Sequence, residues 1–154
     1  MKKFVLVSLA GFLLASPMPA AHADEEQIVI EDLSRAQLRA EIEKIQHEVY
    51  RVFNAANDND ELDIVCHDYV PTGSNIREEA CEPQFVIDKR AENVADSRFF
   101  TDVLLNPAEL QSILGVQFQV LTAAMNAVAA ENRYYSELNA ILKVLRERLE
   151  EFSN

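Results

Sequence analysis

The sequence predicts a mainly α-helical protein, built as a long antiparallel helical hairpin or coiled-coil-like bundle with a small disulfide-closed β-hairpin. Three observations predict this fold class. Apolar residues recur every three or four positions over most of the chain, as they do on one face of a helix. One apolar series near the C-terminus keeps a spacing of seven residues. The two cysteines, Cys66 and Cys81, flank a Pro-Thr-Gly-Ser turn in a stretch without helical spacing.

The composition is that of a folded domain. The 154 residues are 49% hydrophobic and 26% charged, with 3 Gly, 5 Pro and 2 Cys. This is too apolar for a disordered chain, too poor in cysteine for a cystine-rich scaffold, and too poor in glycine and proline for a low-complexity sequence. We therefore expect a single helical domain over residues 34–154, preceded by an acidic N-terminal segment over 24–33.

The first 23 residues have the three parts of a secretory signal peptide. Two lysines form a basic start, residues 4–15 are apolar, and the segment ends in small residues at Ala21 and Ala23. The apolar run is shorter than the roughly 20 residues that a membrane-spanning helix needs. We expect cleavage after Ala23 and a periplasmic or secreted protein.

The charge balance excludes one class of partner. The formal net charge is -12, and removal of the two lysines of the signal peptide takes it to -14. Such a field repels nucleic acid and anionic lipid surfaces, whose binding is driven largely by Lys and Arg. We expect no nucleic-acid partner and no stable membrane insertion after cleavage.

A first helix is predicted over residues 35–56. Ser34 and Gln37 have the spacing of a capping box, in which each side chain bonds the backbone N–H of the other residue. Apolar residues then recur at spacings of three and four, which predicts one buried face. They are Leu38, Ile42, Ile45, Val49, Val52, Phe53 and Ala56.

A second helix is predicted at about 86–105 and a long third helix at about 107–152. Asn106 is a suitable N-cap for the long helix and Pro107 a suitable first residue, and no proline follows. A row of residues spaced by seven forms its predicted coiled-coil seam. The seam residues are Leu114, Leu121, Val128, Tyr135, Leu142 and Leu149.

The apolar seam must pack against another helix. The apolar residues that accompany the seam lie on one side of it before Asn132 and on the other side after it. The irregular spacing indicates local unwinding and overwinding of a coiled coil. A helix over 107–152 would be about 69 Å long at 1.5 Å per residue, much longer than a compact domain of this size. Either the two shorter helices cover the seam within one chain or a second copy covers it, and the pattern alone does not choose.

The segment over residues 57–85 is predicted to form a disulfide hairpin. An exported protein with an even number of cysteines usually oxidises them, so Cys66 and Cys81 are expected to be paired. A two-residue turn centred on Gly73 and Ser74 places the two cysteines directly opposite each other, and glycine suits the first central position of a type II′ turn. That register also opposes two acids, Asp68 and Glu79, which is unfavourable.

A second turn geometry competes with the first. A type I turn at Pro71 and Thr72 followed by a bulge at Gly73 would shift the register and separate the cysteines. The turn residues of interest in both cases are Pro71, Thr72, Gly73 and Ser74.

Residues 53–85 carry a recognisable series of short motifs. They are Phe53-Asn54, the acidic run from Asp60 to Asp63, Ile64-Val65-Cys66, Pro71 to Ser74, and Cys81-Glu82-Pro83. This series resembles a motif of small exported proteobacterial proteins with two cysteines around a Pro-Thr-Gly-Ser turn. The resemblance implies an exported location and supports the disulfide, and it implies no activity. Arg77-Glu78-Glu79 is more acidic here than the segment after the turn in those proteins.

No residue pattern predicts catalysis or a cofactor. The chain has no HExxH, paired CxxC or GxSxG motif. His47, His67 and the cysteines are of the residue types that bind metals, but their spacing matches no metal motif, and we interpret the cysteines as structural. Asp58, Asp60 and Asp63 lack the glycine and distant glutamate of a calcium loop, and they are interpreted as a hydrophilic connector. We predict no catalytic residue, no cofactor and no metal ligand.

Two functions of different class remain. The first is a non-enzymatic protein-interaction or structural envelope protein, whose long amphipathic helix binds itself or an envelope protein. The second is a periplasmic protein that binds a small ligand or a metal such as Ca²⁺ or Zn²⁺ through the acidic connector and the hairpin.

Overall fold

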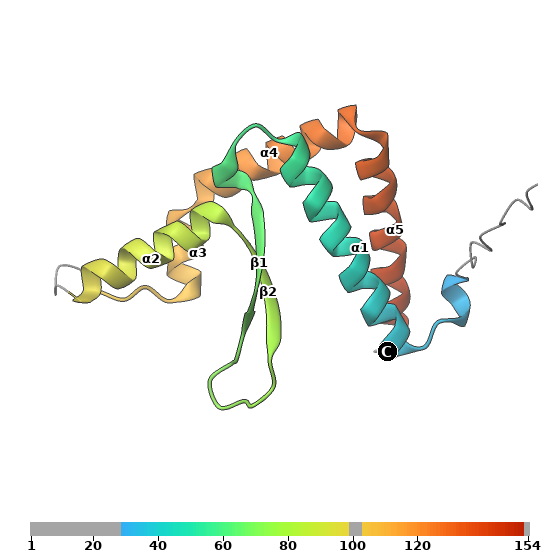
Figure 1. Ribbon diagram of the computed structural model, residues 1–154, viewed down its shortest axis with the longest axis horizontal. Helices are drawn as coiled ribbons and strands as arrows, with labels where there is room; N and C mark the ends of the chain where they lie inside the picture. Colours follow the sequence, from blue (N-terminus) through green and yellow to red (C-terminus); the bar gives the residue numbers. More distant parts are fainter. Residues whose placement is uncertain (1–28, 99–102, 153–154) are drawn as a thin grey trace, which may run out of the picture.

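The computed structural model describes residues 29–98 and 103–152 (Figure 1). The predicted signal peptide, residues 1–23, and the first part of the acidic N-terminal segment lie outside the described residues. The fold is mainly helical with one two-stranded antiparallel hairpin, as predicted. In chain order the elements are η1 (Ile30–Asp32), α1 (Arg35–Ala56), η2 (Asp60–Leu62), β1 (Ile64–Tyr69), β2 (Glu78–Pro83), α2 (Gln84–Arg98), α3 (Pro107–Ile113), α4 (Gly115–Glu131) and α5 (Arg133–Glu151).

Helix α1 has the predicted bounds because its ends are set by local chemistry. The Gln37 backbone N–H donates to Ser34 Oγ at 3.4 Å, and the Ser34 N–H donates to Gln37 Oε1 at 3.0 Å, which forms the predicted capping box. Leu38, Val49 and Phe53 are among its buried residues. The capping box is therefore confirmed, and so is the buried apolar face, except that Ile42 and Ile45 are only partly buried and Ala56 is exposed.

Helix α5 runs antiparallel beside α1 (Figure 1). Near one end of the pair the rings of Phe53 and Tyr135 pack with centroids 6.4 Å apart. Near the other end Leu149 of α5 and Arg39 of α1 line one groove. The hairpin lies between this pair and the α2–α3 pair, and α4 connects the two sides (Figure 1).

The single long helix predicted over 107–152 is wrong, because the chain forms three helices there. The first break is at Leu114, and α3 and α4 are bent by 71° across it. The second is at Asn132, whose extended backbone (φ -110, ψ 101) ends α4 and whose side chain caps α5 by accepting from the Tyr135 N–H. A straight helix of about 69 Å would extend far beyond the roughly 33 Å of α1, so the breaks return the apolar row to one core.

The predicted seam is therefore a buried row in a folded-back segment. Five of its six members belong to the main core cluster, and Leu149 is only partly buried. The five are Leu114, Leu121, Val128, Tyr135 and Leu142. The row is covered within one chain, which is the first of the two arrangements that the pattern allowed.

Helix α2 ends earlier than predicted. It ends at Arg98, residues 99–102 lie outside the description, and Val103 to Asn106 are not helical. The buried side chain of Asn93 donates to the Val103 carbonyl at 3.0 Å and accepts from the Leu105 N–H at 2.8 Å. These bonds pair the backbone groups of Val103 and Leu105 with a side chain of α2. The prediction that the helix reaches residue 105 is therefore wrong at its C-terminal end.

The hairpin has the predicted register. Cys66 pairs with Cys81 in the ladder and the two form a disulfide, with Cα atoms 3.9 Å apart. Asp68 lies opposite Glu79, as expected. Each of these acids has a partner of its own: Arg77 Nη1 lies 3.2 Å from Asp68 Oδ2, and His47 lies beside Glu79.

The predicted turn is wrong although its register is right. The ladder ends at Tyr69 and Glu78, so an eight-residue loop replaces the two-residue turn. Within the loop the Ser74 N–H donates to the Pro71 carbonyl, which places Thr72 and Gly73 at the centre of a turn. Gly73 has φ 83, as the third position of a type II turn requires. Neither predicted turn, the one at Gly73 and Ser74 or the one at Pro71 and Thr72, is present.

No single helix in the described ranges has both the length and the apolarity of a membrane span. Together α3 and α4 reach that composition, but only across their 71° bend.

Candidate functional site

The side chain of Asn54 binds β1 to α1 through both backbone groups of one strand residue. Asn54 Nδ2 donates to the Ile64 carbonyl and Asn54 Oδ1 accepts from the Ile64 N–H, both at 2.9 Å. Because both backbone groups of Ile64 point to Asn54, Ile64 and Pro83 form a non-hydrogen-bonded pair, and so do Cys66 and Cys81 two residues further along. Such pairs are the closer ones in an antiparallel ladder, which suits a cross-strand disulfide.

The face that carries the disulfide is turned to α1. We call Cys66, Asp68, Glu79 and Cys81 the disulfide face, since alternate residues of paired strands share a side. His47 of α1 reaches this face, with Nε2 2.5 Å from Glu79 Oε2. One ligand atom each of His47, Cys66, Glu79 and Cys81 lie within 4.8 Å of one another. The fold therefore gathers a nitrogen, an oxygen and two sulfurs from three elements.

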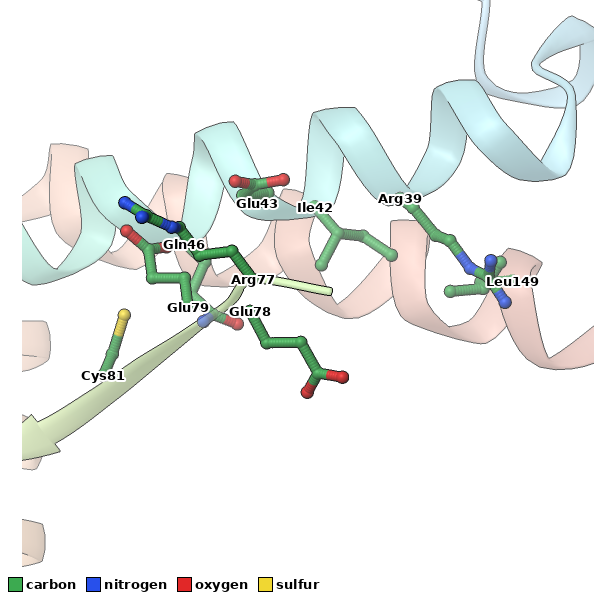
Figure 2. A pocket seen from close by; sticks show the side chains of 9 residues that line it. All are labelled: Arg39, Ile42, Glu43, Gln46, Arg77, Glu78, Glu79, Cys81 and Leu149. Atoms are coloured by element: carbon green, nitrogen blue, oxygen red, sulfur yellow. The ribbon is translucent and has the colours of Figure 1, made fainter. Parts of the chain in front are cut away.

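A groove of about 510 Å³ runs beside this group, between α1, β2 and the end of α5 (Figure 2). Its wall is mixed: Ile42 and Leu149 are apolar, and the other side chains are mostly charged. The lining residues are Arg39, Ile42, Glu43, Gln46, Arg77, Glu78, Glu79, Cys81 and Leu149. The three acids of the groove are Glu43, Glu78 and Glu79, of which Glu79 belongs to the disulfide face, while Arg77 is already paired with Asp68.

The opposite face of the hairpin has its own charged pairs. Arg90 of α2 donates to both carboxylate oxygens of Glu82, at 2.7 and 2.5 Å, and this bond holds the pKa of Glu82 below its usual value. His67 Nε2 lies 3.9 Å from Glu82, and His67 lies opposite Ala80 in the ladder. A hydrogen bond to Glu78 raises the pKa of Tyr69. His67 is therefore on the side away from the disulfide face.

The acidic connector is built into turns. Asn57 Nδ2 donates to Asp63 Oδ1 at 2.8 Å, and its Oδ1 accepts from the Asn59 N–H at 2.9 Å. Asn59 in turn caps η2 by accepting from the Glu61 N–H. Among the described residues, the only close grouping of three or more metal-ligand side chains is the one at the disulfide face, so Asp58, Asp60 and Asp63 form none.

The structure brings together only some of the residues that the sequence singled out. Cys66 and Cys81 are at the site and Pro71 to Ser74 lie in the loop at the hairpin tip. Five of the six seam residues lie in the core, and the sixth, Leu149, lines the groove. Sequence reasoning weighed His47 only as an isolated candidate and missed its meeting with Glu79. The hairpin register places Glu79 on the face of the cysteines, but no local signal places His47 there.

Comparison with known proteins identifies no relative, because no family model, curated protein or solved structure matches this chain. The motif resemblance over residues 53–85 thus stays a prediction.

Proposed function

We propose that this is an exported, non-enzymatic structural protein that self-associates through the outer face of α4. The disulfide is compatible with an oxidising compartment, and the signal-peptide pattern of residues 1–23 agrees with it. The observation that carries the proposal is an exposed apolar row on α4, in a stretch of the chain without charged residues.

The uncharged stretch is unusual for this chain. From Leu110 to Ala130 there is no Asp, Glu, Lys, Arg or His, although 26% of all residues are charged. Within it α4 turns Leu121 and Val128 to the core. Its other side presents what we call the outer row, which consists of Val116, Val120, Ala123 and Ala127.

The outer row is open to solvent. Val116 is 69% exposed and Val120 49% exposed, and both alanines are exposed as well. Exposed apolar residues are ordinary when scattered, but a row of them at helical spacing forms a continuous apolar surface. Water-facing helices of soluble proteins normally carry charges on that side.

A second copy of the chain is the occupant that the charges favour. At the net charge of -14 expected after cleavage, two copies repel each other wherever acidic surfaces meet. The outer row can meet its own copy across a two-fold axis without burying any charge, and a two-fold interface uses the same patch on both subunits. Its alanines let two helices approach closely. The predicted seam is a poorer candidate, since its residues are buried within the chain itself.

The test is a matched pair of variants on α4. Val120→Asp places one carboxylate in the outer row, and Asn126→Asp places one on α4 about a quarter-turn away. Light scattering coupled to size-exclusion chromatography should give twice the chain mass for the wild type and for Asn126→Asp, and the single mass for Val120→Asp. A wild type that is monomeric at every concentration, or a Val120→Asp variant that stays dimeric, contradicts self-association.

The same experiment in cells separates a second copy from another protein. A photo-crosslinking residue in place of Gln119, which is exposed beside the outer row, should give a product with the mass of two chains. A product containing a different protein and no second copy overturns self-association. Mass spectrometry of the cellular protein checks export, with Asp24 expected as the first residue.

A further inference from the structure

Four potential zinc ligands meet where α1 crosses the hairpin, and the proposed self-association does not use them. They are His47 from α1, Cys66 from β1, and Glu79 and Cys81 from β2, with ligand atoms within 4.8 Å of one another. The ligand atoms of a tetrahedral zinc site lie roughly 3.3–3.8 Å apart. Once the bond between the two sulfurs is broken and they have moved apart, side-chain movements of about one to two ångströms place all four ligand atoms around one ion.

The two sulfurs are ligands only when they are not bonded to each other. In the disulfide they carry no thiolate charge, and the group then offers only the imidazole and the carboxylate. A dithiol reductant transfers two electrons and two protons to the disulfide, which yields two thiols and the oxidised reductant. Zn²⁺ then displaces the two thiol protons and binds two thiolates, the His47 nitrogen and a Glu79 oxygen.

The hairpin register does not depend on the disulfide alone. Asn54 holds both backbone groups of Ile64, and the Gln84 N–H donates to the Asp63 carbonyl at 2.8 Å. Both contacts lie within three residues of the cysteines along the strands. Asn54 and His47 are seven residues apart on α1, two turns along the same side, so the helix that fixes β1 also presents His47.

The surroundings favour a cation. Glu43 and Glu78 line the adjoining groove together with Glu79. The two nearby cations are Arg39 and Arg77, and Arg77 is neutralised by Asp68 at 3.2 Å. A thiolate pair in this acidic setting gains most when a divalent ion offsets its charge.

We propose that the reduced protein binds one Zn²⁺ through His47, Cys66, Glu79 and Cys81, and that closing the Cys66–Cys81 disulfide releases the ion. The site is thus gated by the redox state of the cysteines. Two thiolates, one imidazole and one carboxylate are a tetrahedral donor set that Zn²⁺ accepts.

Zinc titration of the full chain in both redox states tests the gate. The protein is reduced with a phosphine under anaerobic conditions and titrated with Zn²⁺ against a chromophoric chelator, and the oxidised protein is titrated in parallel. We expect one Zn²⁺ per reduced chain and an affinity at least about 100-fold lower after oxidation. Equal binding by the two forms overturns the gate, and no binding by the reduced form overturns the site.

Two histidine variants test the geometry and guard against binding by unfolded chain. His67 follows Cys66 directly in the sequence but lies on the opposite face of the hairpin. It could therefore replace His47 as the zinc ligand only in an unfolded chain. His47→Ala should weaken zinc binding by reduced protein about 10- to 100-fold, and His67→Ala should leave it unchanged. The reverse order, or equal affinities for the two variants, overturns the four-ligand site.

Cobalt gives a second readout. Co²⁺ bound by the reduced wild type should show the intense visible bands of tetrahedral thiolate coordination, with the bands shifted in Glu79→Gln. Octahedral spectra, or spectra that Glu79→Gln does not alter, contradict the assignment of Glu79 as a ligand.

Discussion

Helices α4 and α5 follow each other in the chain and carry the same seven-residue repeat, but their outer sides differ. In α5 the repeat places Tyr135 and Leu142 in the core, and the outer side carries many charged residues besides the exposed Ile141 and Val144. Ion pairs cross that side, among them Arg133 with Glu137 at 2.7 Å and Lys143 with Glu147 at 3.8 Å. Pairs so exposed add little stability, but they keep the surface solvated.

In α4 the repeat again places residues in the core, namely Leu121 and Val128, but the outer row is apolar and uncharged. The comparison teaches that a heptad spacing identifies the inner side of a helix and is silent about the outer side. The outer residues decide whether that side of the helix is solvated through charged side chains, as in α5, or offers an apolar surface to a further partner, as we propose for α4.

The largest effect is expected in the inner row of α5. Leu142 is 5% exposed in the core, so Leu142→Asp should destabilise the fold by about 4 kcal/mol or more and abolish most of the helical signal. Glu147→Ala, on the solvated side of the same helix, should be nearly silent. Thermal unfolding followed by circular dichroism measures both, and equal melting curves would show that the inner row is assigned incorrectly.

The junction of the two helices should respond next. Asn132 Oδ1 accepts from the Tyr135 N–H at 3.0 Å and so caps α5. Asn132→Ala should cost about 1 kcal/mol of unfolding free energy, measured by urea denaturation. Asn132→Asp keeps the acceptor and should cost clearly less, whereas equal losses would indicate that the cap contributes nothing.

A smaller effect is expected for the hydrogen bond between α5 and α1 that involves the carboxylate of Glu48. Hydrogen bonds from Arg51 and, to a smaller extent, from the hydroxyl of Tyr134 lower the pKa of Glu48 from 4.5 to about 2. A lowered folded-state pKa means that the carboxylate stabilises the fold above about pH 4.5 and loses this contribution as the pH falls towards 2.

Glu48→Gln removes that dependence. At neutral pH the wild type should melt at a higher temperature than Glu48→Gln. The loss of stability should be smaller than the loss caused by Asn132→Ala, because the pair is exposed. The difference should shrink below about pH 4.5 and be almost gone at pH 2. A difference that stays constant over this range would rule out the carboxylate charge as its cause.

The smallest effect on stability is expected in the outer row of α4. Replacing Val116 and Val120 together by Gln should change the unfolding free energy of the monomer by no more than about 0.5 kcal/mol, since both are exposed. Urea denaturation at low protein concentration measures it. A loss of several kcal/mol would mean that these side chains are covered within the chain, and the contrast with α5 would fail.

Sequence reasoning succeeded where the determining interactions are local. The capping box of Ser34 and Gln37 spans three residues, and it starts α1 where predicted. The hairpin register follows from the need to place Cys66 opposite Cys81. The loop between them was predicted wrongly, because several loop conformations are compatible with one register, and Pro71 does not choose among them.

Sequence reasoning failed where one spacing fits two shapes. A straight helix and three shorter helices place Leu114, Leu121 and Val128 at the same intervals, and only packing around a common core requires the breaks. The second break coincides with the change of side at Asn132, which indicated a local change in winding and not the end of a helix.

The sequence by itself determined the helical class, the bounds of α1, the disulfide register and the residues that face the core, since each depends on periodicity or on neighbours a few residues apart. Tertiary structure alone decided where the long apolar row folds back, which side of α4 stays open, and that His47 meets Glu79 beside the cysteines. His47 and Glu79 are 32 residues apart, and no local spacing encodes their contact. It arises only when Asn54 fixes β1 against α1 and orients the disulfide face.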